Sequence, residues 1–212
     1  MTSRFQSEIS LGPTLPDFTQ EQVKNEPMLF NCDVDFARKI GGPVTNAFID
    51  ALPQQYQYGV IDTRVHMLIP GWYPCIPGWH HDDVPRSTPT GQPNYNNPEY
   101  FSRHCCALIN AAVAPTEFLL GSVQVPTPPD GQVIYRVWDD YLEGTGIEEG
   151  RRFSAPDRQL IFFDANTFHR GVAAVSSGWR WFGRISINTN RKPTNEIRRQ
   201  VQVYMGAVNA GW

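Results

Sequence analysis

The 212-residue sequence lacks the motifs that mark several large enzyme classes. It has no glycine-rich dinucleotide fingerprint, no phosphate-binding P-loop and no GxSxG nucleophile elbow, so these chemistries are not indicated. No apolar run is long enough to span a bilayer, and the first residues contain no continuous apolar stretch of the kind found in secretory signals. We therefore expect a soluble protein that does not use a membrane as a partner.

Cysteine and positive charge are also scarce. The chain has four cysteines, none of them in CxxC spacing: Cys32, Cys75, Cys105 and Cys106. We expect reduced thiols and a cytoplasmic location. The formal net charge of -3 provides no general attraction to a polyanion, so nucleic acid is not indicated as a partner, although a local basic patch stays compatible with one.

Proline and glycine are abundant, with 18 and 17 residues, and hydrophobic residues make up 41% of the chain. This balance predicts many turns around a substantial core, which favours β structure over long helices. We expect a single domain over residues 1–212. Its expected parts are an N-terminal arm over 1–27, a helical segment over 28–57, a β core over 58–190 and a C-terminal segment over 191–212.

Apolar residues recur at helical spacing over 33–40 and again over 43–52, with two glycines between them, which predicts two short helices. From residue 58 onward the apolar runs are short and separated by turn residues, which predicts strands over 59–71, 104–113, 116–125, 132–142, 158–165 and 180–190. Crossover helices have no room between these strands. We therefore expect an all-β core with flanking short helices, arranged as an antiparallel sandwich, barrel or jelly roll.

Two segments outside these strands remain irregular in the sequence. Residues 86–103 are rich in Pro and Asn and predict a long loop, a kind of segment that often serves as a lid or binding loop. The C-terminal segment predicts either a short helix or a last strand. Its basic residues indicate a solvated charged face, with contact to phosphate as the sharper alternative. These residues are Arg191, Lys192, Arg198 and Arg199.

The most informative segment is the run His80-His81-Asp82-Asp83. Alternate side chains of an extended segment share a face, so an HxD pair directs one imidazole and one carboxylate at the same ion. Two registers satisfy this rule, His80 with Asp82 and His81 with Asp83. We favour the first because its Trp79-His80-x-Asp82 pattern resembles the WHxD form of many oxygenases, and we expect the other pair to be solvated or to orient the ligands.

A second imidazole has three candidates outside the run, namely His66, His104 and His169. His169 follows an apolar strand and a turn, where a site at the mouth of a sheet is expected. His104 is interpreted as structural. His66 either lines the pocket or is satisfied in the core. Two histidines and one carboxylate form the facial triad that holds non-haem iron with positions left open.

Basic and hydroxyl side chains follow His169 on one strand. Arg180, Arg184 and Ser186 are spaced to share a face, and arginine binds a carboxylate through two parallel hydrogen bonds. Arg184 and Ser186 form an Arg-x-Ser pair suited to one carboxylate. Arg184 is therefore the first candidate for an acidic co-substrate and Arg180 the second.

The order His80-x-Asp82, then His169, then an arginine resembles the iron(II)/2-oxoglutarate-dependent dioxygenase superfamily over residues 58–190, with phytanoyl-hydroxylase-like and small phage or bacterial members nearest in pattern. This resemblance implies a double-stranded β-helix of the jelly-roll, cupin-like kind. It also implies Fe(II) on His80, Asp82 and His169, 2-oxoglutarate as co-substrate and O2 as oxidant. The implied reaction is hydroxylation of a small molecule, or of an exposed residue of a larger substrate, with formation of succinate.

Two other interpretations stay open. A cupin-like metal enzyme that uses no 2-oxoglutarate has the same type of fold but usually an HxH pair, which this chain lacks. A non-enzymatic viral jelly roll, for structure or binding, is the other alternative, suggested by the polar arm and the Pro-rich loops. The sequence carries no signature for the identity of the hydroxylated substrate.

Overall fold

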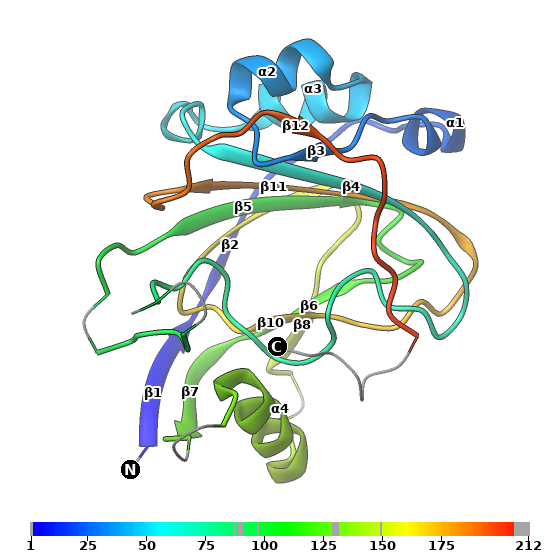
Figure 1. Ribbon diagram of the computed structural model, residues 1–212. Helices are drawn as coiled ribbons and strands as arrows, with labels where there is room; N and C mark the ends of the chain where they lie inside the picture. Colours follow the sequence, from blue (N-terminus) through cyan, green and yellow to red (C-terminus); the bar gives the residue numbers. More distant parts are fainter. Residues whose placement is uncertain are drawn as a thin grey trace.

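The computed structural model describes residues 2–86, 88, 91–96, 98–128, 132–148 and 150–205. The chain forms antiparallel sheets with a few short helices, as the composition indicated (Figure 1). Two of the sheets provide the walls around the predicted site. Helices lie outside them, against the upper sheet and below the lower one in the view of Figure 1.

The larger sheet has five antiparallel strands in the order β2-β9-β5-β11-β4. Its strands are β2 (Ile9–Thr14), β4 (Val60–Leu68), β5 (Arg103–Ile109), β9 (Gln159–Asp164) and β11 (Gly178–Ile187). Strands β4, β5, β9 and β11 confirm four of the six predicted runs. Strand β11 pairs with both β4 and β5, and pairing on both sides fixes which of its side chains face the interior.

The smaller sheets complete the β structure. A three-stranded sheet has the order β10-β6-β8, β1 pairs with β7, and β3 pairs with β12. Their strands are β1 (Thr2–Ser7), β3 (Leu29–Phe30), β6 (Thr116–Leu119), β7 (Gly121–Pro126), β8 (Arg152–Ser154), β10 (His169–Gly171) and β12 (Glu196–Ile197). Strands β6 and β7 confirm the predicted run over 116–125.

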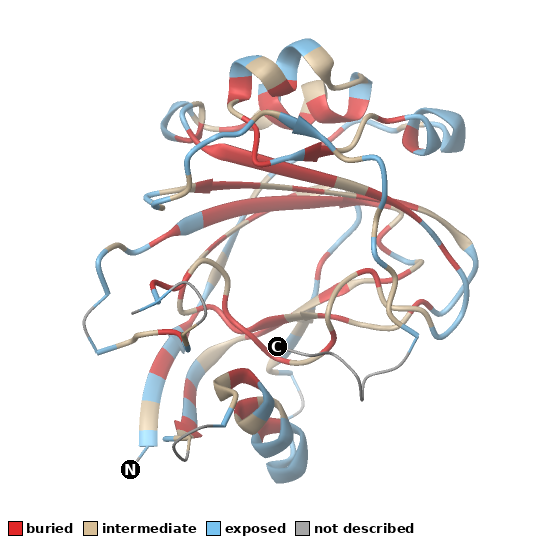
Figure 2. Ribbon diagram, in the orientation of Figure 1, coloured by how far each residue is buried: buried red, intermediate tan, exposed pale blue. Residues whose placement is uncertain are grey.

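Short helices cover the outer face of the five-stranded sheet, where its strands are largely buried (Figures 1 and 2). They are α1 (Gln20–Lys24), α2 (Val34–Ile40), α3 (Pro43–Ala51) and the 3-10 turn η1 (Gln54–Tyr56). Helices α2 and α3 confirm the prediction. The Asp33 carboxylate caps α2 by accepting from the Phe36 amide at 2.7 Å, and Pro43 begins α3, where its missing N–H costs nothing.

The predicted strand over 132–142 is wrong, because this segment is the helix α4 (Ile134–Thr145). Its three buried side chains are Tyr135, Trp138 and Leu142, spaced as on one face of a helix. The dense apolar run around Val133 and Val137 hid this period. Helix α4 packs against β7, and the Trp138 indole N–H donates to the Pro126 carbonyl at 2.9 Å.

Replacing Trp138 with alanine should lower the free energy of unfolding by about 3–5 kcal/mol, since the indole is 1% exposed and its loss leaves a cavity. Tyr141→Ala, on the exposed face of the same helix, should change it by no more than about 0.5 kcal/mol. Urea denaturation of both variants measures the difference. Equal costs would contradict the burial of Trp138 against β7 and the exposure of Tyr141.

Regular secondary structure occurs in the described parts of both terminal segments, 1–27 and 191–212. Residues 2–19 of the predicted arm are largely extended, as expected, but β1 and β2 add strands to two sheets, and residues 20–24 form α1. Over residues 191–205, the described part of the C-terminal segment, the chain forms the short strand β12 and no helix. Parts of the predicted loop 86–103, and residues 206–212, lie outside the described residues. Among the described helices, none has the length and apolar character needed to cross a bilayer.

Candidate metal centre

The predicted ligands His80, Asp82 and His169 come together at the edge of the three-stranded sheet. His80 and His169 face each other across an isolated antiparallel bridge, in which each backbone N–H donates to the other's carbonyl at 3.0 and 3.1 Å. One possible ligand atom from each of the three residues lies within 4.8 Å of the others. The bridge thus places the HxD segment beside strand β10 although 87 residues separate Asp82 from His169.

Backbone carbonyls fix the orientation of both imidazoles. The Nδ1 of His80 lies 2.8 Å from the Gly78 oxygen, and the Nδ1 of His169 lies 2.9 Å from the Thr167 oxygen. A carbonyl oxygen only accepts, so each Nδ1 carries a proton and each Nε2 faces the cluster, where the Nε2 of His169 lies 3.1 Å from a carboxylate oxygen of Asp82. This is the tautomer that a metal-binding histidine needs, held by the outer hydrogen bond that such ligands usually have.

The electrostatics keep His80 and Asp82 in the protonation states that bind a metal. Burial, together with His169, lowers the pKa of His80 to about 4. Burial favours the neutral form of Asp82, but the Arg184 guanidinium and His169 outweigh it and hold the pKa of Asp82 well below its usual range. At neutral pH His80 is therefore neutral and Asp82 is charged. Two imidazoles and one carboxylate fit Fe(II) and leave further positions for small ligands.

The competing pair, His81 and Asp83, points elsewhere. His81 is buried, its ring centroid lies 4.0 Å from that of Phe168, and its Nδ1 lies 2.8 Å from the Tyr95 hydroxyl. The Asp83 carboxylate approaches Arg191 at 3.7 Å. His81 therefore serves the aromatic core next to α4 and does not orient a ligand.

A cavity of about 240 Å³ opens from the triad, and its wall includes side chains of β4, β6 and β11. Arg180 lies in this wall and is 2% exposed. Its guanidinium donates to the Thr116 hydroxyl at 3.2 Å, and its Nε has no hydrogen-bond partner among the described residues. Within that part of the chain no carboxylate forms an ion pair with Arg180. Burial lowers the pKa of Arg180 to about 10.

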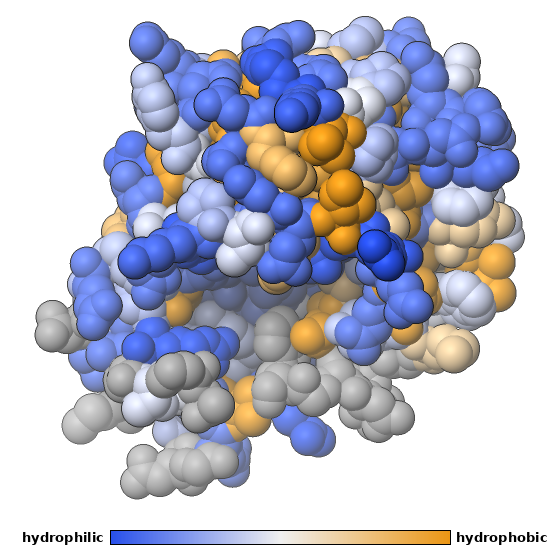
Figure 3. Space-filling model, turned by 45° about the horizontal axis from the view of Figure 1, so that its top comes forward, coloured by the Kyte–Doolittle hydropathy of each residue, from blue (hydrophilic) through white to orange (hydrophobic). Residues whose placement is uncertain are grey.

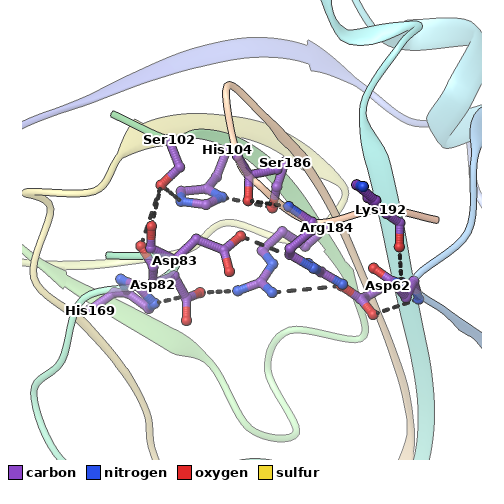
Figure 4. A network of polar contacts seen from close by, with 12 residues as sticks. Asp62, Asp82, Asp83, Ser102, His104, His169, Arg184, Ser186 and Lys192 are labelled. Carbon is purple, nitrogen blue, oxygen red and sulfur yellow. Dashed lines mark hydrogen bonds and ion pairs between the residues drawn. The ribbon is translucent and has the colours of Figure 1, made fainter. Parts of the chain in front are cut away.

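Arg184, two positions along the same face of β11 from Phe182, is in the opposite situation. It forms ion pairs with Asp82 and, at 3.7 Å, with Asp62 (Figure 4). Burial disfavours its charged form, but Asp82, Asp83 and Asp62 together raise the pKa of Arg184. Its charge is already matched by carboxylates of the protein.

Ser186 shares this strand face but does not join Arg184 at a common carboxylate site. It is fully buried, and its hydroxyl lies 2.9 Å from the Nδ1 of His104 (Figure 4). The Nε2 of His104 lies 3.1 Å from the Ser102 hydroxyl, which donates in turn to the Asp83 carbonyl. His104 is therefore structural, as expected, and links β5 and β11 to the ligand-bearing segment.

Acid should destabilise the metal-free protein in part through His104. Burial lowers the pKa of His104 to about 3, whereas the unfolded side chain titrates near 6.5. Between these values the unfolded state binds more protons, so stability is lost as pH falls through this window, at up to about 1.4 kcal/mol per pH unit. Urea titrations at several pH values should show a shallower loss for His104→Gln. An unchanged slope would contradict the assignment.

His66 lines the cavity while being 1% exposed, so it combines both sequence interpretations. It lies opposite Arg180 in the β4/β11 register, and burial followed by Arg180 lowers its pKa to about 4. Sequence reasoning missed Thr116 and Asp62, which contact the two arginines. The alternation of β4 could have identified Asp62 as facing inward, but nothing in the sequence marks Thr116.

Comparisons with known proteins give distant structural similarities. A scan against protein-family models finds no match, and a search of curated proteins finds none. Among solved structures, the chain is similar to a non-heme monooxygenase, the ThoJ-Ni complex, with 12% identity, a TM-score of 0.40, and coverage of 89% of this chain and 77% of the other. It is also similar to CytC3 with Fe(II) and alpha-ketoglutarate, with 9% identity, a TM-score of 0.41, and coverage of 83% and 72%.

Similarity at this level does not assign an activity. The chain nevertheless resembles the iron(II)/2-oxoglutarate oxygenase superfamily in the way the sequence indicated, because a β-rich antiparallel fold carries a triad of two buried histidines and one half-buried carboxylate.

Proposed function

We propose that this protein is an Fe(II)- and 2-oxoglutarate-dependent oxygenase that hydroxylates its substrate and forms succinate. His80, Asp82 and His169 hold the iron, and Arg180 anchors the co-substrate. The two facing sheets form the double-stranded β-helix implied by the sequence resemblance. The bound iron supplies a centre at which 2-oxoglutarate and O2 meet and react.

The observation that carries the proposal is the unmatched charge of Arg180. A buried guanidinium without a carboxylate partner is costly unless a ligand completes it. Its cavity is the one that contains the triad, and at about 240 Å³ it suits a small dicarboxylate. The keto-acid end of 2-oxoglutarate lies toward the triad, and its other carboxylate accepts hydrogen bonds from Arg180 and Thr116.

This assignment reverses the order of the two arginines given by the sequence. Arg184 has Asp82 and Asp62 as partners, so it neutralises a ligand carboxylate and a wall carboxylate of the protein itself. Arg184 is thus a positioning residue for Asp82. Ser186 supports the segment that carries Asp82 only indirectly, through its hydrogen bond with His104. It does not bind the co-substrate, which is the role of Arg180.

The remaining residues of the cavity limit access to the triad. Pro74, Cys75 and Ile76 precede the HxD segment, and Tyr204 closes the wall from the C-terminal segment. These groups keep bulk water from the reacting atoms, which protects a reactive intermediate from side reactions. The substrate is a small molecule or an exposed group of a larger one.

The test is turnover of 2-oxoglutarate by purified protein under air, with succinate as the measured product. We expect succinate to form only with Fe(II), and slowly without a second substrate. Omission of iron and replacement of 2-oxoglutarate by glutarate are the controls. An iron-loaded, folded protein that binds no 2-oxoglutarate would instead support a cupin-like enzyme, and one without iron affinity would support a non-enzymatic jelly roll.

A further inference from the structure

A second pocket lies next to the metal cavity and is rich in positive charge. It has a volume of about 360 Å³. Five cationic side chains line it, from β4, β11 and the C-terminal segment: Arg64, Arg184, Arg191, Lys192 and Arg198. Two carboxylates, Asp62 and Asp83, face them, and Asp82 of the neighbouring cavity pairs with Arg184, which leaves an excess of two positive charges in a chain of net charge -3. We refer to these seven residues as the cationic pocket.

The two carboxylates of the cationic pocket are fewer than the guanidinium groups that pair with them. Asp62, 4% exposed, accepts from Arg191 at 2.7 Å and also lies 3.7 Å from Arg184 and 3.6 Å from Arg198. Figure 4 shows Asp62 between Arg184 and the segment that carries Lys192. One carboxylate thus serves three guanidinium groups, and their combined charge is only partly neutralised.

Arg64 and Lys192 contribute charge that no carboxylate of the described residues neutralises through an ion pair. Neither side chain forms an ion pair or hydrogen bond with another described residue. Arg64 is half-buried on the inward face of β4, opposite Phe182 in the strand register. The Arg191 Nη1 is also buried without a hydrogen-bond partner among the described residues. The donors are therefore in place for a ligand and are not consumed by the fold.

The cationic pocket opens directly beside the iron-binding triad. Asp62, Arg64 and Arg184 line both cavities, and Arg184 contacts the ligand Asp82. Figure 3 shows a hollow on this face of the molecule, bordered largely by hydrophilic residues. A molecule anchored in the cationic pocket can therefore extend past Arg64 to the triad.

We propose that the cationic pocket binds a phosphate group carried by the molecule to be hydroxylated. A phosphate monoester carries close to two negative charges at neutral pH and offers three acceptor oxygens, which matches several converging cations. A single carboxylate needs only one arginine, and Arg180 already serves that purpose in the neighbouring cavity. The assignment of the phosphate to the oxygenase substrate rests on the proposed function, whereas binding in the pocket does not.

The test is calorimetric titration of inorganic phosphate into the full-length, metal-free protein at constant ionic strength. We expect saturable binding of one phosphate, weakened at least about tenfold in Arg64→Gln/Lys192→Gln because two donors are lost. These two residues hold no carboxylate of the fold, so the variant should remain folded. The matched control is Lys39→Gln/Arg136→Gln, which removes two exposed positive charges elsewhere and should bind phosphate as the unmodified protein does.

Any one of three results would contradict phosphate binding in the cationic pocket. These are absence of saturable phosphate binding, equal affinity in the two double variants, or acetate binding as tight as phosphate. The visible absorption of the unmodified protein with Fe(II) and 2-oxoglutarate is recorded in parallel. An iron signal without phosphate binding rejects the pocket alone, and phosphate binding without the iron signal rejects the oxygenase but keeps the pocket.

Discussion

Replacing His80 with glutamine is expected to weaken Fe(II) binding by more than about 100-fold, whereas His81→Gln should leave it within a few-fold of the unmodified protein. Loss of an outer hydrogen-bond partner alone costs 10–100-fold in metal affinity, and loss of a ligand costs more. Anaerobic Fe(II) titration of both variants measures the effect. His81→Gln is the matched control, since it changes an adjacent buried histidine that is not one of the three clustered ligands.

The opposite ranking would move the site to the second register. If His81→Gln lost iron and His80→Gln kept it, the ligands would be His81 and Asp83. The thermal stability of each variant separates unfolding from loss of the ligand. His81→Gln should lower the midpoint more than His80→Gln, because His81 packs among the aromatic rings beside α4.

The second large effect concerns the two arginines of β11. Arg180→Gln should raise the dissociation constant of 2-oxoglutarate by at least about 30-fold, because truncating one partner of a buried charge pair costs about 2–5 kcal/mol. The same change should not lower the stability of the ligand-free protein, since it removes a buried charge that has no carboxylate partner.

Arg184→Gln should behave in the reverse way. It leaves Asp62 and Asp82 with fewer cationic partners, so the free energy of unfolding should fall by several kcal/mol, about 3–5 by analogy with other broken buried pairs. Equilibrium binding of 2-oxoglutarate and urea denaturation, performed on both variants, give the comparison. Unchanged 2-oxoglutarate binding in Arg180→Gln would show that Arg180 is not the anchor.

Much of this site follows from local rules that the sequence exposes. The alternation of strands placed Arg180 and Arg184 on one face, and the HxD spacing placed His80 and Asp82 together. These local rules do not show which of the two arginines is available to bind a ligand. The two are equivalent by spacing, and only the contacts of Arg184 with Asp62 and Asp82, which come from other segments, distinguish them.

The errors in the fold have a similar origin. In α4 the helical period of Tyr135, Trp138 and Leu142 was present, but neighbouring valine and isoleucine residues gave the run the appearance of a strand. In β1 and β2 the polar, Pro-containing sequence carries little strand signal. These strands exist because β7 and β9 offer them backbone hydrogen bonds, a contribution that no single-segment pattern reveals.

The cationic pocket shows that predicting function from the sequence has the same limit. The sequence suggested either a solvated face or phosphate contact for Arg191, Lys192 and Arg198, with overall acidity against the second. Arg64 lies more than 120 residues earlier and gave no sign of belonging with them. Only the folded chain places it beside them, facing the same pocket.

The most direct test of the central claim is an anaerobic titration of the protein with Fe(II), with and without 2-oxoglutarate, followed by visible absorption. Chelation of ferrous iron by a keto acid produces a weak charge-transfer band. We expect the band in the unmodified protein only when both are present, its loss in His169→Ala, and a shift of its 2-oxoglutarate dependence to higher concentration in Arg180→Gln. A folded, iron-loaded protein that shows no band at saturating 2-oxoglutarate would contradict the proposed oxygenase.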